Sequence, residues 1–154
     1  MENFRTLGCL SCNIINGIIQ PEGGTILETD LFHIHQDLAY PIPGFVILAS
    51  KRHFYHLHEL TSPELAEFTQ LLFRIRKAQQ EALDIETVYY FYNEDTTHHF
   101  HLWLLPRYEW MQKIGRSVES VRPVLQYAAT YLNTEEDRAE VRKSAQKLYK
   151  TLKL

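Results

Sequence analysis

The sequence predicts an α+β fold, in which an antiparallel sheet of about five strands carries one long helix and further helices follow at the C-terminus. Short strand-like runs are bounded by Gly, Pro and Asn, one apolar stripe has helical spacing, and the last third is helical throughout. The 154 residues can bury a full core. We therefore expect one domain over 1–154, with a core at 1–107 and a helical extension at 108–154.

The composition narrows the class of partner. With 16 Lys and Arg against 19 Asp and Glu, the net charge of -3 does not favour a nucleic-acid polymer or an anionic membrane. The start, MENFRTLGCL, lacks a signal peptide's basic and apolar regions, and no run approaches the roughly 18 apolar residues of a membrane span. A cytoplasmic protein without a membrane partner is expected.

The first part of the chain predicts a helical turn followed by a hairpin. After the cysteines, IINGIIQPEGG contains Asn-Gly and Pro-Glu-Gly-Gly, which predict a short helix or turn and then a loop. A strand can begin at 25–28. A turn at 41–44, rich in Pro and Gly, precedes 45–50, FVILAS, a continuous apolar run typical of a buried central strand.

The strand expected at 31–36, LFHIHQ, alternates apolar and imidazole side chains. Phe32 and Ile34 should therefore share one face, and His33 and His35 the other.

The long helix is expected from TSPE at 61–64 to Leu83. TSPE has capping-box spacing and tolerates proline in the first turn. Apolar residues recur at three- and four-residue steps, which predicts one buried stripe. The stripe comprises Leu65, Phe68, Leu71, Leu72, Ile75, Ala78 and Ala82.

Two further strands should form the second hairpin. Residues 87–92, TVYYFY, are aromatic and β-branched, a polar turn follows at 93–96, and 97–107 is the antiparallel partner, closed by Pro106.

From Ser117 the pattern is helical. Pro123 either kinks the first helix or lies in its opening turn. Thr134 and Asp137 have capping-box spacing and mark the start of the second helix.

The strand at 97–107, THHFHLWLLPR, carries a cluster of histidines. Alternation places His99, His101 and Trp103 on one face, while the apolar residues between them cover the core. The two imidazoles would be about 7 Å apart along the backbone and could act on one ligand. The simpler alternative is a set of polar residues on a solvated face.

Cys9 and Cys12 are too close for a useful structural disulfide and suit a metal or redox pair. Together with His53 and one histidine of the 97–107 strand, they have the composition of a tetrahedral zinc site. The alternatives are a thioredoxin-like dithiol, which usually opens a helix directly after a strand, or no role.

Three motifs give the chain a resemblance to the histidine triad (HIT) superfamily. HFHLWLLPR at 99–107 resembles the triad signature, in which three histidines alternate with apolar residues; CLSCNIINGII at 9–19 resembles the N-terminal opening; and QDLAYPIPGFVILASKRH at 36–53 resembles the segment between them. The resemblance spans 9–107 in order and spacing, and no motif covers 108–154.

This resemblance implies a nucleotide or dinucleotide substrate, a homodimer, and hydrolysis or transfer of nucleotidyl groups at the α-phosphate, as in diadenosine polyphosphate hydrolases. His101 would be the nucleophile and form a nucleotidyl-histidine intermediate. Asn93 and Thr96 would donate to phosphate oxygens, Asp37 would accept from ribose hydroxyls, and Ile34 lies on the strand against which the base packs.

In the zinc-containing branch, the resemblance assigns the metal to Cys9, Cys12, His53 and His99. A zinc ion closed by four protein ligands is structural, since it has no open position to activate water.

Two residues depart from the family pattern. Trp103 replaces the third histidine and offers one neutral N–H donor, so it could narrow the substrate site or stack on a ligand. Phe45 replaces the histidine of the Pro-Gly-His motif. Two further hypotheses are therefore kept: a catalytically impaired nucleotide-binding module with a structural zinc, and a purely structural zinc protein. The remaining histidines receive no role: His33, His35, His56, His58 and His98.

Overall fold

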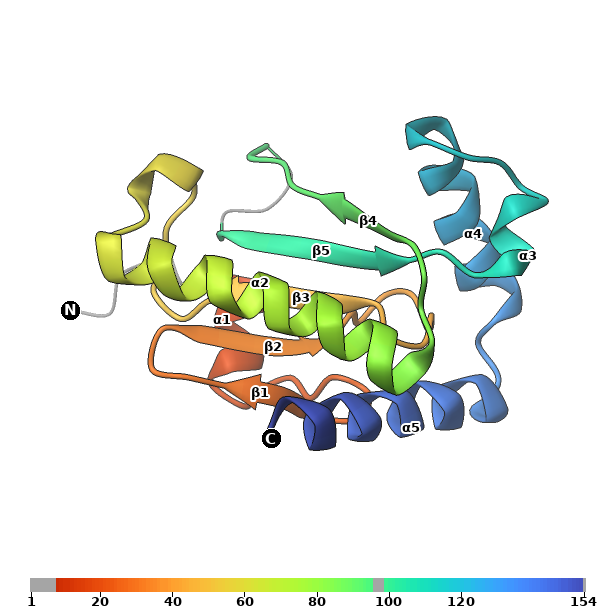
Figure 1. Cartoon of the computed structure of the whole chain (residues 1–154), viewed down its shortest axis with the longest axis horizontal. Helices are drawn as coiled ribbons and strands as arrows, with labels where there is room; N and C mark the ends of the chain where they lie inside the picture. The colour runs from red at the N-terminus through yellow and green to blue at the C-terminus, as the bar shows by residue number, and fades with distance from the viewer. Residues whose placement is uncertain (1–7, 96–98, 154) are drawn as a thin grey trace.

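The computed structural model describes residues 8–95 and 99–153, and its centre is a five-stranded antiparallel sheet (Figure 1). The strand order is β1-β2-β3-β5-β4. The strands are β1 Thr25–Glu28, β2 Phe32–Gln36, β3 Val46–Ser50, β4 Val88–Phe91 and β5 His101–Pro106. The predicted α+β class and both predicted hairpins are confirmed.

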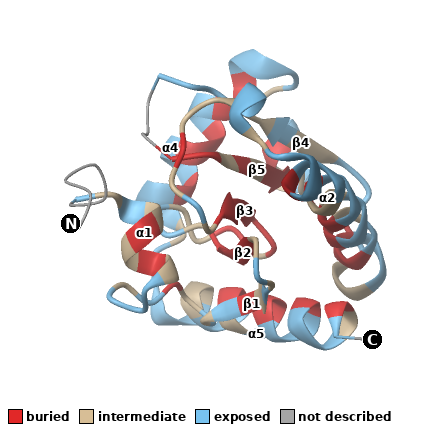
Figure 2. Ribbon diagram, turned by 90° about the vertical axis from the view of Figure 1, so that its left-hand side faces the viewer, coloured by how far each residue is buried: buried red, intermediate tan, exposed pale blue. Residues whose placement is uncertain are grey.

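Helices cover both faces of the sheet. Figure 2 shows α2 on one side, and α1 and α4 on the other. The helices are α1 Leu10–Ile15, α2 Ser62–Leu83, α3 Glu109–Gln112, α4 Val121–Tyr131 and α5 Glu135–Leu152, with 3₁₀ turns η1 Leu57–Glu59 and η2 Val118–Ser120. None of these helices, within the described ranges, is long and apolar enough to cross a membrane.

The sheet separates two apolar cores. Alternation along β5 sends Leu104 into the core beneath α2 and α5, and Leu105 into the core beneath α4. Strand β3 is buried along its whole length because both of its faces are covered, as its continuous apolar run predicts.

The capping box of α2 is confirmed. Thr61 accepts a hydrogen bond from Glu64 N, and the Glu64 carboxylate accepts one from Thr61 N. One stripe position was wrong: Leu65 is 51% exposed. At 3.6 residues per turn, Leu65 is rotated by about 80° from the fully buried Ile75, which places it at the edge of the stripe.

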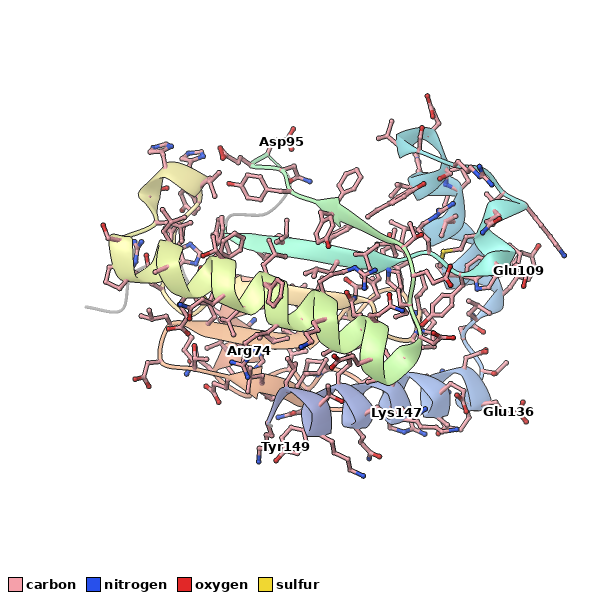
Figure 3. All side chains as sticks on the ribbon, viewed as in Figure 1. Arg74, Asp95, Glu109, Glu136, Lys147 and Tyr149 are labelled. Carbon is pink, nitrogen blue, oxygen red and sulfur yellow. The ribbon has the colours of Figure 1, made fainter. Side chains whose placement is uncertain are left out.

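The C-terminal helices divide between the two faces. α5 packs on α2 and β1, whereas α4 contributes to the second core. The predicted cap of α5 is confirmed, since Thr134 accepts from Asp137 N, and Pro123 lies in the first turn of α4. Charged residues of α5, such as Glu136 and Lys147, project outwards (Figure 3).

Gly23 allows α5 to approach the β1 loop closely. Its φ is +81°, and a Cβ added there would lie 2.5 Å from the Cβ of Ala145. Any side chain at this position would therefore push α5 away from the sheet.

Candidate functional site

The four predicted metal ligands lie together, and their ligand atoms are all within 4.8 Å of one another. Cys9 is the N-cap of α1 and Cys12 lies in its first turn, His53 follows β3, and His99 precedes β5. Four of the six separations between ligand atoms are 3.4 Å for Cys9 Sγ to His99 Nδ1, 3.5 Å for Cys12 Sγ to His99 Nδ1, 3.3 Å for Cys12 Sγ to His53 Nδ1, and 3.1 Å for His53 Nδ1 to His99 Nδ1.

These separations fit a tetrahedral zinc ion. Zn–S bonds near 2.3 Å and Zn–N bonds near 2.05 Å place tetrahedral ligands about 3.3 to 3.8 Å apart. Burial, followed by the neighbouring Cys9, raises the pKa of Cys12 to about 12, so a bound cation is needed to keep this sulfur as a thiolate. The chain therefore holds a Cys₂His₂ cluster suited to structural zinc.

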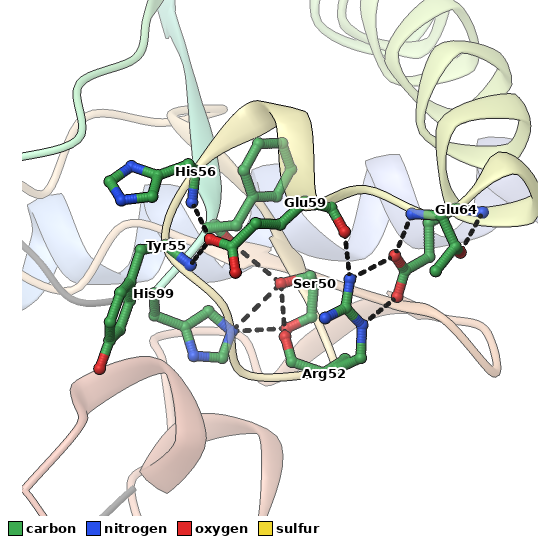
Figure 4. Close-up of polar contacts among 9 residues, drawn as sticks. Ser50, Arg52, Tyr55, His56, Glu59, Glu64 and His99 are labelled. Carbon is green, nitrogen blue, oxygen red and sulfur yellow. Dashed lines mark hydrogen bonds and ion pairs between the residues drawn. The ribbon is translucent and has the colours of Figure 1, made fainter. Parts of the chain in front are cut away.

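The tautomer of His99 is set by the neighbouring strand. Its Nε2 lies 2.6 Å from the backbone oxygen of Ser50, which can only accept, so Nε2 carries the proton (Figure 4). The lone pair of the neutral ring is therefore at Nδ1, the atom that faces the thiols and His53.

The loop that carries His53 is fastened to the start of α2. Arg52 donates from Nε and Nη2 to the Glu64 carboxylate, at 2.9 and 2.8 Å, and from Nη2 to the backbone oxygen of Glu59 at 2.7 Å (Figure 4). Glu64 is 3% exposed, and its bonds to Arg52 hold its pKa at about 2. This bidentate pair fixes the residue next to the metal ligand.

His101 has the opposite tautomer. Its Nδ1 lies 2.8 Å from the backbone oxygen of His99, so Nδ1 carries the proton and the neutral ring has its lone pair at Nε2. Burial lowers the pKa of His101, which keeps the ring neutral at pH 7. An imidazole in this state is a competent nucleophile.

His101 lines a cavity of about 260 Å³ that lies between α1 and the sheet. Two other predicted substrate residues, Asp37 and Trp103, line the same cavity. Leu10 and Ile14 of α1 form an apolar wall, so the helix at whose start the two cysteines lie also bounds the cavity.

Asp37 is held in a turn directly after β2. Its Oδ1 accepts from the backbone N–H groups of Ala39 and Tyr40, both at 2.9 Å. Burial nevertheless raises the pKa of Asp37 to about 6. The carboxylate is thus preorganised, incompletely hydrated and suited to accept from a ligand hydroxyl.

His35 was assigned no role from the sequence, yet it lines the cavity and is 3% exposed. Its Nδ1 donates to the backbone oxygen of Gln36 at 2.8 Å, and burial lowers its pKa to about 4. It therefore presents an uncharged imidazole whose Nε2 is an acceptor. The alternation of β2 had already placed His35 opposite the core, but only the strand order reveals that it shares a cavity with His101.

Trp103 and Phe45, the two departures from the triad pattern, contact each other. Their rings meet edge to face, with centroids 5.6 Å apart and planes at 78°. The two substitutions thus form one aromatic pair in place of two imidazoles.

Two predicted substrate residues, Ile34 and Asn93, do not line the cavity that His101 lines. The prediction for Ile34 was wrong: it is 0% exposed in the core beneath α2, because alternation along β2 turns it away from His35 and the cavity. Asn93 lines a second cavity, which Trp103 also bounds. Thr96 lies outside the described residues, as does His98.

Several solved structures with a similar fold are histidine triad proteins. A zinc-bound histidine triad family protein from Mycobacterium smegmatis aligns over 93% of this chain and 96% of its own, with 20% identity and a TM-score of 0.62. A HIT family protein from Bacillus subtilis aligns over 83% and 99%, with 18% identity and a TM-score of 0.61. A hypothetical histidine triad nucleotide-binding protein from Sulfolobus tokodaii aligns over 90% and 92%, with 18% identity and a TM-score of 0.59.

A HIT family hydrolase from Legionella pneumophila aligns over 64% of this chain and 91% of its own, with 23% identity and a TM-score of 0.51. No family model matches the sequence, and neither does any curated protein. The chain has the fold of the histidine triad proteins, and the zinc-type cluster lies within that fold.

Proposed function

We propose that this chain, which has the histidine triad fold, is a nucleotidyl hydrolase or transferase that attacks the α-phosphate of a nucleoside polyphosphate or dinucleoside polyphosphate. The observation that carries the proposal is the state of His101. Its Nδ1–H is bound to the His99 carbonyl, and its ring lines a cavity that also contains Asp37.

The chemistry proceeds in two displacements. Nε2 of His101 forms a bond to phosphorus as the bond from phosphorus to the leaving oxygen breaks, and the leaving group departs with the electron pair. Water or another acceptor then attacks phosphorus, the P–N bond breaks, and the acceptor's proton is released to solvent. The His99 carbonyl stabilises the cationic ring during the first step, because it accepts from Nδ1–H throughout.

The substrate class follows from Trp103. An indole N–H can donate a hydrogen bond but cannot transfer a proton at neutral pH, so this position cannot protonate a leaving group. Phosphate chains leave as stable anions, whereas the amine of a phosphoramidate must be protonated. We therefore favour polyphosphate substrates over nucleoside phosphoramidates.

Asp37 and His35 supply the acceptors for the nucleoside. The Asp37 carboxylate suits ribose hydroxyls, and neutral His35 suits an N–H or O–H donor of the ligand. Leu10, Ile14 and Ile47 give the cavity apolar surface for a base.

Zinc has a positioning role in this proposal. Bound by Cys9, Cys12, His53 and His99, it would supply a cross-link between α1 and the segment that holds His101.

The second candidate is a nucleotide-binding module without turnover. The aromatic pair of Phe45 and Trp103 favours it, because these two side chains replace imidazoles of the family pattern and His101 is the histidine of the triad that remains to contact a phosphate. The two candidates differ only in chemistry, so a labelled-substrate assay separates them.

The assay incubates the protein with nucleoside triphosphates and dinucleoside polyphosphates labelled at the α-phosphate. We expect product, or an acid-labile nucleotidyl adduct, with the wild type and with the control variant His58→Ala, whose ring is exposed and outside the cavity. His101→Ala should give neither while still binding nucleotide. Binding without product in the wild type would favour the module, and no binding of any nucleotide would refute both candidates.

We also propose a homodimer, in keeping with the family resemblance. Two large apolar side chains of α2, Leu65 and Phe73, are exposed, the latter by 70%, and edge strand β4 exposes Tyr90. Sedimentation of the wild type and of Phe73→Glu tests this assignment.

A further inference from the structure

A second cavity, of about 610 Å³, adjoins the one that contains His101. Tyr40 and Trp103 line both cavities, so these two side chains form the wall between them. The far walls come from Phe91 of β4, from Asn93 just after this strand, and from α4 of the C-terminal extension. The second cavity begins one side chain from the nucleophile, since the rings of His101 and Trp103 have centroids 6.3 Å apart.

The lining of the second cavity combines aromatic surface with one positive charge. Tyr40, Phe91 and Trp103 provide rings, and the charge comes from Arg122 of α4. No Asp or Glu is among the described residues that line it. A planar group and an anion are the ligand features that such a surface favours.

Among the described residues, Arg122 lacks the ion-pair partner that three other arginines of this chain have. Arg52 pairs with Glu64, Arg138 with Glu135, and Arg142 with Glu22 and Glu135. Arg122 is exposed and has no ion-pair partner within residues 8–95 and 99–153. Its guanidinium is therefore available to an anionic ligand, and α4 directs it to a cavity next to the proposed nucleophile.

The first cavity is too small for the whole of a polyphosphate substrate. Its 260 Å³ lies below the range of about 300 to 1,000 Å³ that is usual for ligand sites, whereas the second cavity lies within this range. A substrate that reacts at His101 therefore has a second compartment for the part beyond the reacting phosphorus.

We propose that the second cavity binds the leaving-group half of the substrate, an anionic group that carries a planar ring, such as the second nucleotide of a dinucleoside polyphosphate. Arg122 contacts its phosphate, and the ring packs against Trp103 and Phe91. This inference rests on the proposed function. It gives α4 a part in substrate selection, and it makes Trp103 a wall of the leaving-group site in place of a proton donor.

The experiment measures binding by calorimetry with two kinds of probe. The first is the set of nucleoside 5′-monophosphates, which match the half of the substrate in the first cavity. The second is the set of matching dinucleoside triphosphates with methylene bridges, which His101 cannot cleave. Each probe is tested on the wild type, on Arg122→Gln, and on Arg116→Gln, an exposed arginine outside the cavity lining that serves as the matched control.

We expect the wild type to bind a dinucleotide at least about tenfold more tightly than the monophosphate. Arg122→Gln should bind the dinucleotide about tenfold more weakly than the wild type does, because one charge-assisted hydrogen bond is lost. Monophosphate affinity should not change in either variant, which also shows that both remain folded.

Two outcomes would overturn the inference without affecting the proposed function. One is that the wild type binds both probes with equal affinity, and the other is that Arg122→Gln binds the dinucleotide as tightly as the wild type does. Binding of neither probe would refute the proposed function and the inference together.

Discussion

His99 and His101 are two residues apart, yet a backbone carbonyl assigns each ring a different chemistry. Ser50 O accepts from Nε2 of His99, which leaves the lone pair at Nδ1, in the metal-type cluster. His99 O accepts from Nδ1 of His101, which leaves the lone pair at Nε2, the atom proposed as the nucleophile. The backbone of the metal ligand thus holds the proposed nucleophile. Any disturbance of the metal site should reach His101 through this one hydrogen bond.

Asp37 provides a test at the scale of a single residue. Its pKa of about 6 in the folded protein is above the ordinary value of 3.8, because burial disfavours the carboxylate. A raised pKa contributes stability below pH 4 that is lost as the pH rises through 6. At pH 8 the ionised group therefore destabilises the fold, by at most about 3 kcal/mol.

Asp37→Asn keeps an oxygen acceptor for the Ala39 and Tyr40 N–H groups but carries no charge. We expect the variant to unfold at a higher denaturant concentration than the wild type at pH 8, and at the same concentration at pH 4. A difference that does not depend on pH would contradict burial of the charge as its cause. If Asp37 binds ribose, the more stable variant should also bind nucleotide more weakly.

At the scale of elements, the N-terminus of α2 connects the helix to the metal site. Glu64 caps the helix through Thr61 N and holds Arg52 beside His53. A buried carboxylate with both functions is worth more than an exposed ion pair, for which about 0 to 1 kcal/mol is usual.

Glu64→Gln should lower the free energy of unfolding at pH 7 by about 1 to 3 kcal/mol, because the amide cannot accept both bonds from Arg52. The matched control is Glu81→Gln on the same helix, which loses only the exposed pair with Lys77. Urea unfolding of both variants provides the measurement, and equal effects would count against a special role for Glu64.

For the whole molecule, the metal cluster joins segments far apart in the sequence. Cys9 and His99 are 90 positions apart, and α1 forms one wall of the cavity that His101 lines. A cross-link over so long a loop restricts the unfolded chain strongly, whether it is a disulfide or a metal.

We expect metal analysis to find one zinc ion per chain. Cys12→Ser should lose this zinc, and its melting temperature should be lower than that of the wild type by more than about 5 °C. His58→Ala, which removes an exposed histidine outside the cluster, should keep both the zinc and the melting temperature. Full zinc content in Cys12→Ser would show that the metal binds elsewhere. Since thiolates bind zinc and thiols do not, zinc should also be released as the pH falls.

Local patterns of the sequence determined the sheet, the long helix, its cap and the separation of His99, His101 and Trp103 from the core, because alternation and helical spacing depend only on neighbouring residues. Residue type and spacing also predicted a metal site at Cys9, Cys12 and His53, and the family resemblance identified His99 as its fourth ligand. Strand order, in contrast, depends on packing between distant segments. Only the tertiary structure placed His35 beside His101, turned Ile34 into the core, brought Phe45 against Trp103, and set Arg122 of the motif-free extension at the second cavity.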